Sequence, residues 1–260
     1  YIWVFYNNNF FATGNQRFNF YIIMININCD LGEGLNNEHI IMPLINSCNI
    51  ACGGHAGNNE SMIQCIEIAI RNNLQIGAHP SYPDRLNFGR KKIDISSSEF
   101  SHSIINQVES LEQIASSYGK EINHIKAHGA LYNEMINDSD IADFYLDTVK
   151  DYKESCSLYV PYNSKIEKLA LKKGFNIIYE VFGDRNYNDD LSLVSRDKEN
   201  AIINSPDNVI KHLKPIVESN TVKTITGNYN EIKFDTICIH SDTNNSIEIL
   251  KNINRVFKNR

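Results

Sequence analysis

The sequence lacks the features of several large classes of protein. Basic residues are scarce, because 25 Lys and Arg against 31 Asp and Glu leave a net charge of 25 − 31 = −6. Neither nucleic-acid binding through a broadly basic face nor docking to a membrane through a polybasic patch is therefore expected. No apolar run reaches the roughly 20 residues that a membrane-spanning helix needs. The 260 residues, 42% of them hydrophobic, are enough for one sizeable core.

Common catalytic and cofactor motifs are also missing. There is no Gly-x-x-x-x-Gly-Lys-Ser/Thr phosphate loop and no Gly-x-Gly-x-x-Gly after a predicted strand. There is no Gly-x-Ser-x-Gly nucleophile elbow. These absences disfavour a dinucleotide dehydrogenase and a serine hydrolase. Because His-Glu-x-x-His is also absent, we expect any metal ion to be bound by residues from different strands.

The six cysteines form no regular framework and no Cys-x-x-Cys pair. Cys48 and Cys52 are four residues apart, but no partners follow at the spacing of a zinc site. In a chain of this length we interpret the cysteines as small buried hydrophobic residues in a reducing compartment. This interpretation predicts a cytoplasmic location. The six are Cys29, Cys48, Cys52, Cys65, Cys156 and Cys238.

Residues 1–23 differ from the remainder of the sequence. They begin without Met and contain an Asn run (Asn7, Asn8 and Asn9) and the only Trp. A secretory signal would show a cationic start, an unbroken apolar stretch and a cleavage site of small residues, none of which is present. We interpret residues 1–23 as an N-terminal extension outside the fold, lying upstream of a true start at Met24. An amphipathic anchor is the weaker alternative. The predicted domain spans residues 24–260.

From Met24 onward, short apolar segments alternate with helix-like segments. This pattern is typical of a parallel sheet with right-handed crossovers. The predicted strands are Ile25–Cys29, Cys48–Cys52, Leu74–Ala78, His124–Ala127, Leu158–Val160, Ile177–Val181 and Thr236–Ile239. The predicted helices are Glu38–Ile45, Glu60–Arg71, Ser98–Tyr118, Asp140–Val149, Ser164–Lys173, Pro206–Glu218 and Asn245–Val256. Polar residues at almost every strand end favour a (β/α) barrel, where such ends meet on one face, over a doubly wound open sheet.

The first two strand ends supply acids and a histidine. Asp30 and Glu33 follow the first strand, where they would bind a metal ion, orient a histidine, act as a base, or simply cap the next helix. His55 follows the second strand among three glycines, which lose much chain entropy on folding and so indicate a close backbone approach. A lone buried histidine is otherwise more often structural.

The next two strand ends supply two histidines and two cationic side chains. His79 ends the third strand, and Arg90 lies in the loop that follows, either pairing with an anion or remaining a solvated loop charge. Strand alternation places Lys126 and His128 on the same side, which in a barrel faces inward. An inward Lys needs a charged partner or a lowered pKa. His124, at the beginning of this strand, is predicted to be structural.

The last strand ends add further ionisable groups. Glu180 and Arg185 belong to the sixth strand and the turn after it, and His240 and Asp242 follow the seventh. Histidines and carboxylates that converge from several strands are typical of a divalent metal site or of a proton relay.

Several of these segments occur together in one known family. They are Asn28–Gly34, Ala51–Gly57, Gly77–Pro80, Phe88–Arg90 and Lys126–Tyr132, continued by Glu180–Arg185, Tyr187–Arg196 and Asp235–Thr243. In order and spacing they resemble the LamB/YcsF family from Met24 to the C-terminus. That family usually has an aromatic residue where this chain has Gly54, so the resemblance implies a larger pocket there.

The resemblance also implies a fold and an activity. The fold is a distorted seven-stranded (β/α) barrel, related to glycoside hydrolases and polysaccharide deacetylases. The reaction is the opening of 5-oxoproline to L-glutamate coupled to ATP hydrolysis, together with the 5-oxoprolinase subunits B and C and with Mg²⁺ accompanying ATP. Two alternatives are a metal-dependent amidase or deacetylase that works without ATP, and a non-catalytic subunit that binds a lactam or a carbohydrate.

On this hypothesis the ionisable residues divide into two groups. The predicted catalytic residues are Asp30, His55, His79, Lys126 and His128. The predicted substrate- or phosphate-binding residues are Glu33, Arg90, Glu180, Arg185, His240 and Asp242. Lys126 and Arg90 would neutralise phosphate or a substrate carboxylate, and the histidines would transfer protons. The acids Asp30, Glu33 and Asp242 would orient the histidines or hold a divalent ion.

Overall fold

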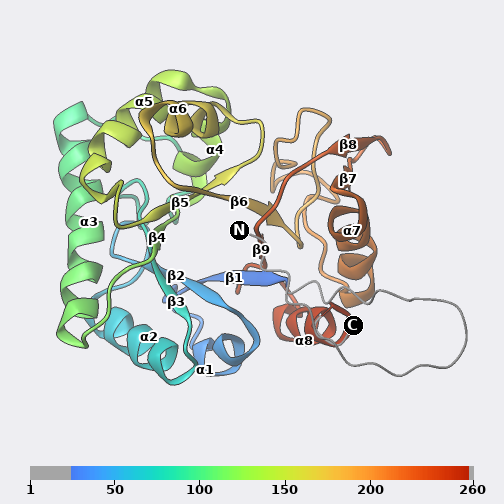
Figure 1. Cartoon of the computed structure of the whole chain (residues 1–260), viewed down its shortest axis with the longest axis horizontal. Coiled ribbons are helices and arrows are strands. Elements are labelled where there is room, and N and C mark those ends of the chain that lie inside the picture. The colour runs from blue at the N-terminus through green and yellow to red at the C-terminus, as the bar shows by residue number, and fades with distance from the viewer. Residues whose placement is uncertain (1–24, 258–260) are drawn as a thin grey trace, which may run out of the picture.

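In the computed structural model, residues 25–257 are described, and seven parallel strands among them close into a barrel (Figure 1). Around the barrel the strands follow the order β1-β2-β3-β4-β5-β6-β9. They are β1 (Asn26–Leu31), β2 (Ser47–Ala51), β3 (Gln75–His79), β4 (His124–Ile125), β5 (Ser157–Pro161), β6 (Ile177–Phe182) and β9 (Thr236–Cys238). The prediction of a (β/α) barrel with seven strands is confirmed. The predicted extension 1–23 lies outside the described residues.

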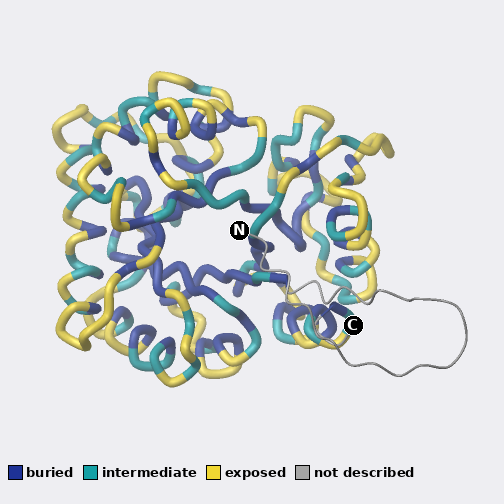
Figure 2. The backbone as a smooth tube through the Cα atoms, in the orientation of Figure 1, coloured by how far each residue is buried: buried dark blue, intermediate teal, exposed yellow. Residues whose placement is uncertain are grey.

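Eight α-helices in the described part of the chain lie outside this barrel. They are α1 (Glu38–Ile41), α2 (Asn59–Arg71), α3 (Ser97–Ser117), α4 (Gly129–Asn137), α5 (Ser139–Thr148), α6 (Lys165–Lys173), α7 (Pro206–Ser219) and α8 (Ser246–Phe257). Figure 2 shows buried backbone around the barrel and exposed backbone on the outer sides of the helices. None of the helices in residues 25–257 has the length and apolar character needed to cross a bilayer.

The outer face of the barrel is apolar and packs against the helices. Ile27 of β1, Ile50 of β2 and Ile237 of β9 are fully buried in this layer. All six cysteines are buried and unpaired, as predicted for small hydrophobic residues. Because successive side chains of a strand point to opposite faces, the alternate residues face the barrel interior. In this chain many of those inward residues are polar.

The barrel interior contains a hydrogen-bonded polar layer on the side of the amino-terminal ends of the strands. The Asn49 amide donates to Asn28 Oδ1 at 2.8 Å, and the His124 ring contacts Asn49 Oδ1 at 2.7 Å and stacks on Tyr159. Gly77 makes room for this ring, because a Cβ there would lie 2.1 Å from His124 Nε2. The structural role predicted for His124 fits this position, below the level of the strand ends.

One helix and one pair of strands were not predicted. Helix α4 starts directly after His128, at a motif that we interpreted as a strand end. A short antiparallel pair, β7 (Thr221–Lys223) with β8 (Tyr229–Glu231), lies between α7 and β9. Two helix ends in the described residues are capped by their own sequence. Ser96 and Glu99 form a capping box at the start of α3, and Gly174 ends α6 in the left-handed conformation.

Candidate functional site

Three charged residues from three strands meet at the carboxyl-terminal end of the barrel. The Lys126 ammonium donates to Asp30 Oδ1 at 2.8 Å and forms an ion pair with Glu180 Oε1 at 2.9 Å. Asp30 belongs to β1, Lys126 directly follows β4, and Glu180 belongs to β6. All three side chains are at most 5% exposed. The inward orientation predicted for Lys126 and its need for a charged partner are therefore both met.

These contacts determine which groups carry charge. Burial by itself opposes an ammonium, but the carboxylate of Asp30 and that of Glu180 hold the pKa of Lys126 well above its usual range. Burial likewise opposes ionisation of Asp30, whereas His79 and Lys126 bring its pKa well below the usual range. The Asn49 amide gives Asp30 Oδ1 a second donor at 2.8 Å. The pair is therefore ionic at neutral pH.

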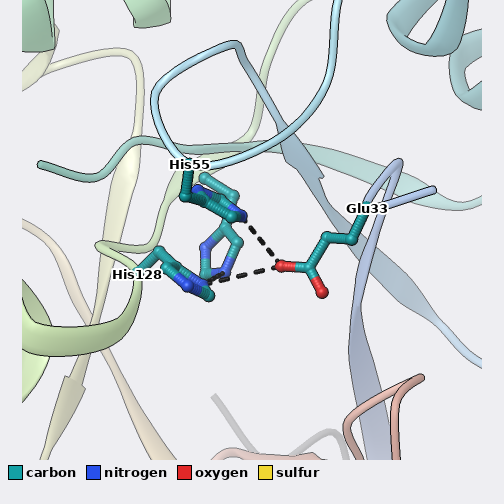
Figure 3. Close-up of side chains that lie close together, drawn as sticks. Glu33, His55 and His128 are labelled. Atoms are coloured by element: carbon teal, nitrogen blue, oxygen red, sulfur yellow. Dashed lines mark hydrogen bonds and ion pairs between the residues drawn. The ribbon is translucent and has the colours of Figure 1, made fainter. Parts of the chain in front are cut away.

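Three imidazoles and one carboxylate form a cluster beside this ion pair. His55 Nε2 lies 2.9 Å from Glu33 Oε1, and His128 Nδ1 lies 3.6 Å from the same oxygen (Figure 3). The His55 and His128 rings stack face to face with centroids 3.6 Å apart. His79 Nε2 lies 3.0 Å from His128 Nδ1 and 3.3 Å from Asp30 Oδ2. The predicted convergence of His55, His79 and His128 is thus present.

Two of these rings donate a hydrogen bond to a backbone carbonyl through the nitrogen that does not face the cluster. His79 Nδ1 donates to the carbonyl of Lys126 at 2.8 Å, and His128 Nε2 donates to the carbonyl of Phe88 at 3.0 Å. Burial holds the pKa of His128 well below its usual value, and the neighbouring His55 and His79 add to this effect. Burial also lowers the pKa of His55. His55 and His128 are therefore neutral at pH 7.

His240, which follows β9, is positioned by a buried carboxylate. Asp184 is fully buried, and its oxygens accept from His240 Nδ1 at 3.0 Å, from the backbone N–H of His240 at 3.0 Å and from the Thr243 hydroxyl. Burial opposes the charge on Asp184, but His240 and these hydrogen bonds bring its pKa below the usual value. This arrangement leaves His240 Nε2 without its proton when the ring is neutral, so that it can accept one.

Arginine side chains form the outer part of the site. Asp242 Oδ2 accepts from Arg90 at 2.6 Å and lies 3.5 Å from Arg196. The Arg185 guanidinium instead donates to the backbone carbonyls of Val194 and Ala201. Burial, with Arg196 nearby, lowers the pKa of Arg185 to about 10. Arg90 and Arg196 can therefore bind an incoming anion, in competition with Asp242.

The charged network and the histidine cluster border one cavity of about 480 Å³. That volume suits a small metabolite. Seven of the predicted site residues line it, namely Asp30, His79, Arg90, Lys126, His128, Arg185 and His240. The other four contact these lining residues: Glu33 and His55 contact His128, Glu180 contacts Lys126, and Asp242 contacts Arg90.

The expectation of a larger pocket at Gly54 is wrong for this chain. A Cβ at Gly54 would lie 2.3 Å from Gln107 Oε1 and 2.5 Å from Ser81 Oγ. The Gln107 side chain is fixed there, because it accepts from the Ser81 N–H and donates to the Ser81 carbonyl. The space next to Gly54 is therefore filled by polar side chains and is not added to the cavity.

Some residues of the site were missed in the sequence. Asn49 hydrogen-bonds Asp30, Asp184 orients His240, and the Phe88 carbonyl holds His128. Asp184 does follow a strand, as the predicted site residues do, so its position was a usable signal. Asn49 and the Phe88 carbonyl carried no such signal, because an amide inside a strand and a loop carbonyl are common in every fold.

Comparisons with known proteins agree with the fold and with the motifs. The model of the LamB/YcsF family matches residues 25–260. The chain is 35% identical over 241 residues to the A subunit of 5-oxoprolinase from Pyrococcus abyssi, covering 90% of this chain and 94% of that protein. It is 36% identical over 240 residues to the A subunit of 5-oxoprolinase from Bacillus mycoides, covering 90% and 94%. The crystal structure of lactam utilization protein from Thermus thermophilus superposes with a TM-score of 0.82 at 26% identity, covering 89% of this chain and 96% of that one.

Proposed function

The chain belongs to the LamB/YcsF family, and on that premise we propose that it is the A subunit of an ATP-dependent 5-oxoprolinase. In the proposed reaction 5-oxoproline is opened to L-glutamate while ATP is hydrolysed to ADP and phosphate, with subunits B and C as partners. The names of the relatives and of the solved structure support the lactam substrate. The cavity beside the charged network is the observation on which this chain's own part rests.

The chemistry of lactam opening explains the need for both ATP and a site of this kind. The amide carbonyl of a five-membered lactam is a poor electrophile, and phosphorylation of its oxygen makes the carbon open to attack by water. A base must then remove a proton from water, and an acid must protonate the ring nitrogen as the C–N bond breaks. His240, which lines the cavity and can accept a proton at Nε2, is suited to one of these two transfers.

The charged residues have separate parts in this proposal. Arg90 and Arg196 bind the carboxylate of 5-oxoproline or a phosphate group, displacing Asp242. Lys126 neutralises Asp30 and Glu180, and the field of its ammonium at the cavity floor stabilises negative charge that develops on the reacting carbonyl. Arg185, whose guanidinium bonds the backbone carbonyls of residues 194 and 201, shapes the wall.

The test is reconstitution of the complete enzyme. The purified chain is mixed with subunits B and C, ATP, Mg²⁺ and 5-oxoproline, and the release of glutamate and phosphate is measured with and without each component. Glutamate should form only when the three subunits and ATP are all present. Glutamate release by this chain alone without ATP would instead support the metal-dependent amidase, and binding of 5-oxoproline without turnover in the full mixture would support a purely binding role.

A variant of Asp184 tests the part assigned to His240 in the same assay. Asp184→Asn replaces the carboxylate that accepts from His240 Nδ1, so the ring loses its fixed tautomer. We expect kcat to fall by about 100-fold or more, with a smaller change in KM and a shift of the pH profile of kcat. Thr243→Val, which removes a different hydrogen bond to Asp184, is the control and should keep the pH profile. An unchanged profile in Asp184→Asn would contradict the assignment.

A further inference from the structure

We propose that Glu33, His79 and His128 form a binding site for one divalent transition-metal ion, with His55 orienting the Glu33 carboxylate. The site lies in the histidine cluster beside the cavity (Figure 3). The inference goes beyond the proposed function, because neither lactam opening nor ATP hydrolysis by itself requires these residues to bind a metal ion.

The outer hydrogen bonds of two rings fix where their protons are. A carbonyl oxygen only accepts, so His79 Nδ1 and His128 Nε2 each carry a hydrogen. In the neutral rings the inner nitrogens, His79 Nε2 and His128 Nδ1, are then both lone pairs, and they lie 3.0 Å apart. Two lone pairs at hydrogen-bond distance repel each other. A cation next to both nitrogens removes this repulsion.

The outer hydrogen bonds of the two rings are those of metal-binding histidines. A shared proton would also remove the repulsion, with Asp30 Oδ2 at 3.3 Å from His79 Nε2 as its counter-charge, so it is the geometry of the donor atoms that favours a metal ion. Histidines that bind metals characteristically donate their outer N–H to a backbone carbonyl or a carboxylate. His79 and His128 both do so, on carbonyls from two different segments of the chain.

Two of the distances between the donor atoms are close to those of a tetrahedral site. With metal–ligand bonds of about 2.0–2.1 Å, two ligand atoms of a tetrahedron lie about 3.3 Å apart. The His79 and His128 nitrogens are 3.0 Å apart, and His128 Nδ1 is 3.6 Å from Glu33 Oε1. Because His79 and His128 also line the cavity, the fourth position would be open to water or to a substrate, as in catalytic zinc sites with two histidines and one carboxylate.

His55 is assigned a positioning role rather than a ligand role. Its Nε2 lies 2.9 Å from Glu33 Oε1, at the distance of a hydrogen bond that holds this carboxylate in place. Its Nδ1 is buried without a hydrogen-bond partner in residues 25–257. If Nε2 bound the metal ion, Nδ1 would have to carry a buried hydrogen with no acceptor, which costs free energy.

A second group of donor atoms is less suitable. Asp30, Cys238 and His240 also approach one another. However, the Lys126 ammonium already donates to Asp30 Oδ1 and to Cys238 Sγ, at 2.8 and 3.2 Å. A metal ion bound there would face that ammonium at close range. The inner donor atoms of the first group instead contact one another, at 3.0 Å between the two nitrogens and 3.6 Å from nitrogen to carboxylate oxygen.

The chemistry of the donors indicates the class of ion. Imidazole nitrogens with one carboxylate suit Zn²⁺ and neighbouring first-row ions, whereas Mg²⁺ and Ca²⁺ prefer oxygen ligands. The proposed ion is therefore distinct from the Mg²⁺ that accompanies ATP. Zn²⁺ is the appropriate probe.

Binding of Zn²⁺ to the full chain, without lactam, ATP or partner proteins, is the decisive experiment. Protein stripped with a chelator is dialysed against buffered Zn²⁺, bound metal is counted by mass spectrometry, and the thermal unfolding midpoint is recorded. We expect one Zn²⁺ per chain and a higher midpoint. His79→Gln, His128→Gln and Glu33→Gln should each weaken binding by at least about 100-fold, and His55→Gln by about 10-fold.

A matched control separates this site from general imidazole binding. His212 is buried and lies in α7, with its Nε2 on the carbonyl of Phe182, and His212→Gln should bind Zn²⁺ as the unmodified chain does. The proposal is overturned if the unmodified chain binds no stoichiometric Zn²⁺, or if His128→Gln binds it as tightly as His212→Gln. If one variant does not fold, the remaining three decide the outcome. If the unmodified chain binds no Zn²⁺, the reconstitution assay can still show glutamate release, and only the metal site is refuted. If reconstitution yields no glutamate, the bound Zn²⁺ can still be counted, and only the proposed function is refuted.

Discussion

At the scale of single residues, Lys126 is the side chain on which most of the buried charge depends. Its ammonium contacts both Asp30 and Glu180, and all three side chains are at most 5% exposed. Removing one member of a buried ionic group is costly, because the remaining charges keep their desolvation cost and lose their partner. Removing Lys126 alone should therefore lower the free energy of unfolding more than removing Lys126 together with the charge of one of its carboxylate partners.

The corresponding prediction concerns Lys126→Met, which keeps the length of the side chain and removes its charge. We expect the free energy of unfolding to fall by about 3–5 kcal/mol, measured by urea denaturation at about pH 7.5. The double variant with Glu180→Gln should recover part of this loss, because one of the unpaired carboxylates is then neutral. Lys92→Met, at an exposed lysine that pairs with Glu134 at 3.4 Å, should change stability by less than about 1 kcal/mol. A double variant no more stable than Lys126→Met would contradict this account.

At the scale of elements, the start of α4 and the loop before α3 are joined at one close contact. Gly129 begins α4 with φ of +60°, and a Cβ there would lie 2.5 Å from the carbonyl oxygen of Gly89. The same carbonyl accepts from the N–H of Ala130 at 2.9 Å. The residue before Gly89 is Phe88, whose carbonyl holds His128. The position of the loop therefore determines the orientation of a site histidine.

This contact leads to a prediction about Gly129→Ala. The added Cβ meets the loop backbone, so the loop must move and the hydrogen bond from His128 to Phe88 should be lost. Gly119→Ala is a matched control, because Gly119 has φ of +67° but no atom within 4 Å of its Cβ position. Both variants should lose about 1–2 kcal/mol of stability from backbone strain, and only Gly129→Ala should also lose about 10-fold or more in glutamate release by the reconstituted complex. Equal losses of activity in both variants would contradict the proposed role of the loop.

At the scale of the whole molecule, the sequence pattern favoured a barrel over a doubly wound open sheet, and the family resemblance implied its seven strands. The seven apolar segments were short, separated by helix-like segments and followed by polar residues, which only a parallel arrangement places on one face. Strand parity also predicted the inward direction of Lys126. Because the carboxyl ends of parallel strands meet, residues as distant as Asp30, Lys126 and His240 were expected at one site, and all three line the same cavity.

The details that were missed depend on contacts between distant segments. Helix α4 begins with Gly129 and has only nine residues, so its helical propensity is weak, and packing of Leu131 and Met135 into the core compensates. The effect of Gly54 could not be read locally either, because the space is filled by Gln107 from α3. The outer partners of His79 and His128 are backbone carbonyls, which every residue has and which no side-chain pattern identifies.

Two buried histidines outside the metal cluster make the stability of the whole molecule depend on pH. Burial lowers the pKa of His124 to about 3 and that of His212 to about 4. In the unfolded chain each takes up a proton near pH 6.5, whereas in the folded chain neither does until far lower pH. Their contribution to stability is therefore fully present above about pH 6.5 and is lost as the pH falls toward the folded pKa values. The lowered pKa values of Asp30 and Asp184 act in a more acidic range, below the usual pKa of Asp at about 3.9.

We therefore expect the chain, stripped of metal with a chelator, to lose about 4 kcal/mol of unfolding free energy between about pH 7.5 and pH 5 through these two rings, or about 2 kcal/mol each. Urea denaturation at several pH values between these limits measures the total loss, to which His55 and His128 also contribute because burial lowers their pKa values. His212→Gln removes one of the two rings, and its pH dependence should be shallower by about 2 kcal/mol over the same interval. His39→Gln, at an exposed histidine of α1, leaves both buried rings in place and should follow the unmodified chain. A His212→Gln curve parallel to that of the unmodified chain would show that His212 takes up its proton at the same pH in the folded and the unfolded chain, contrary to its burial against the Phe182 carbonyl.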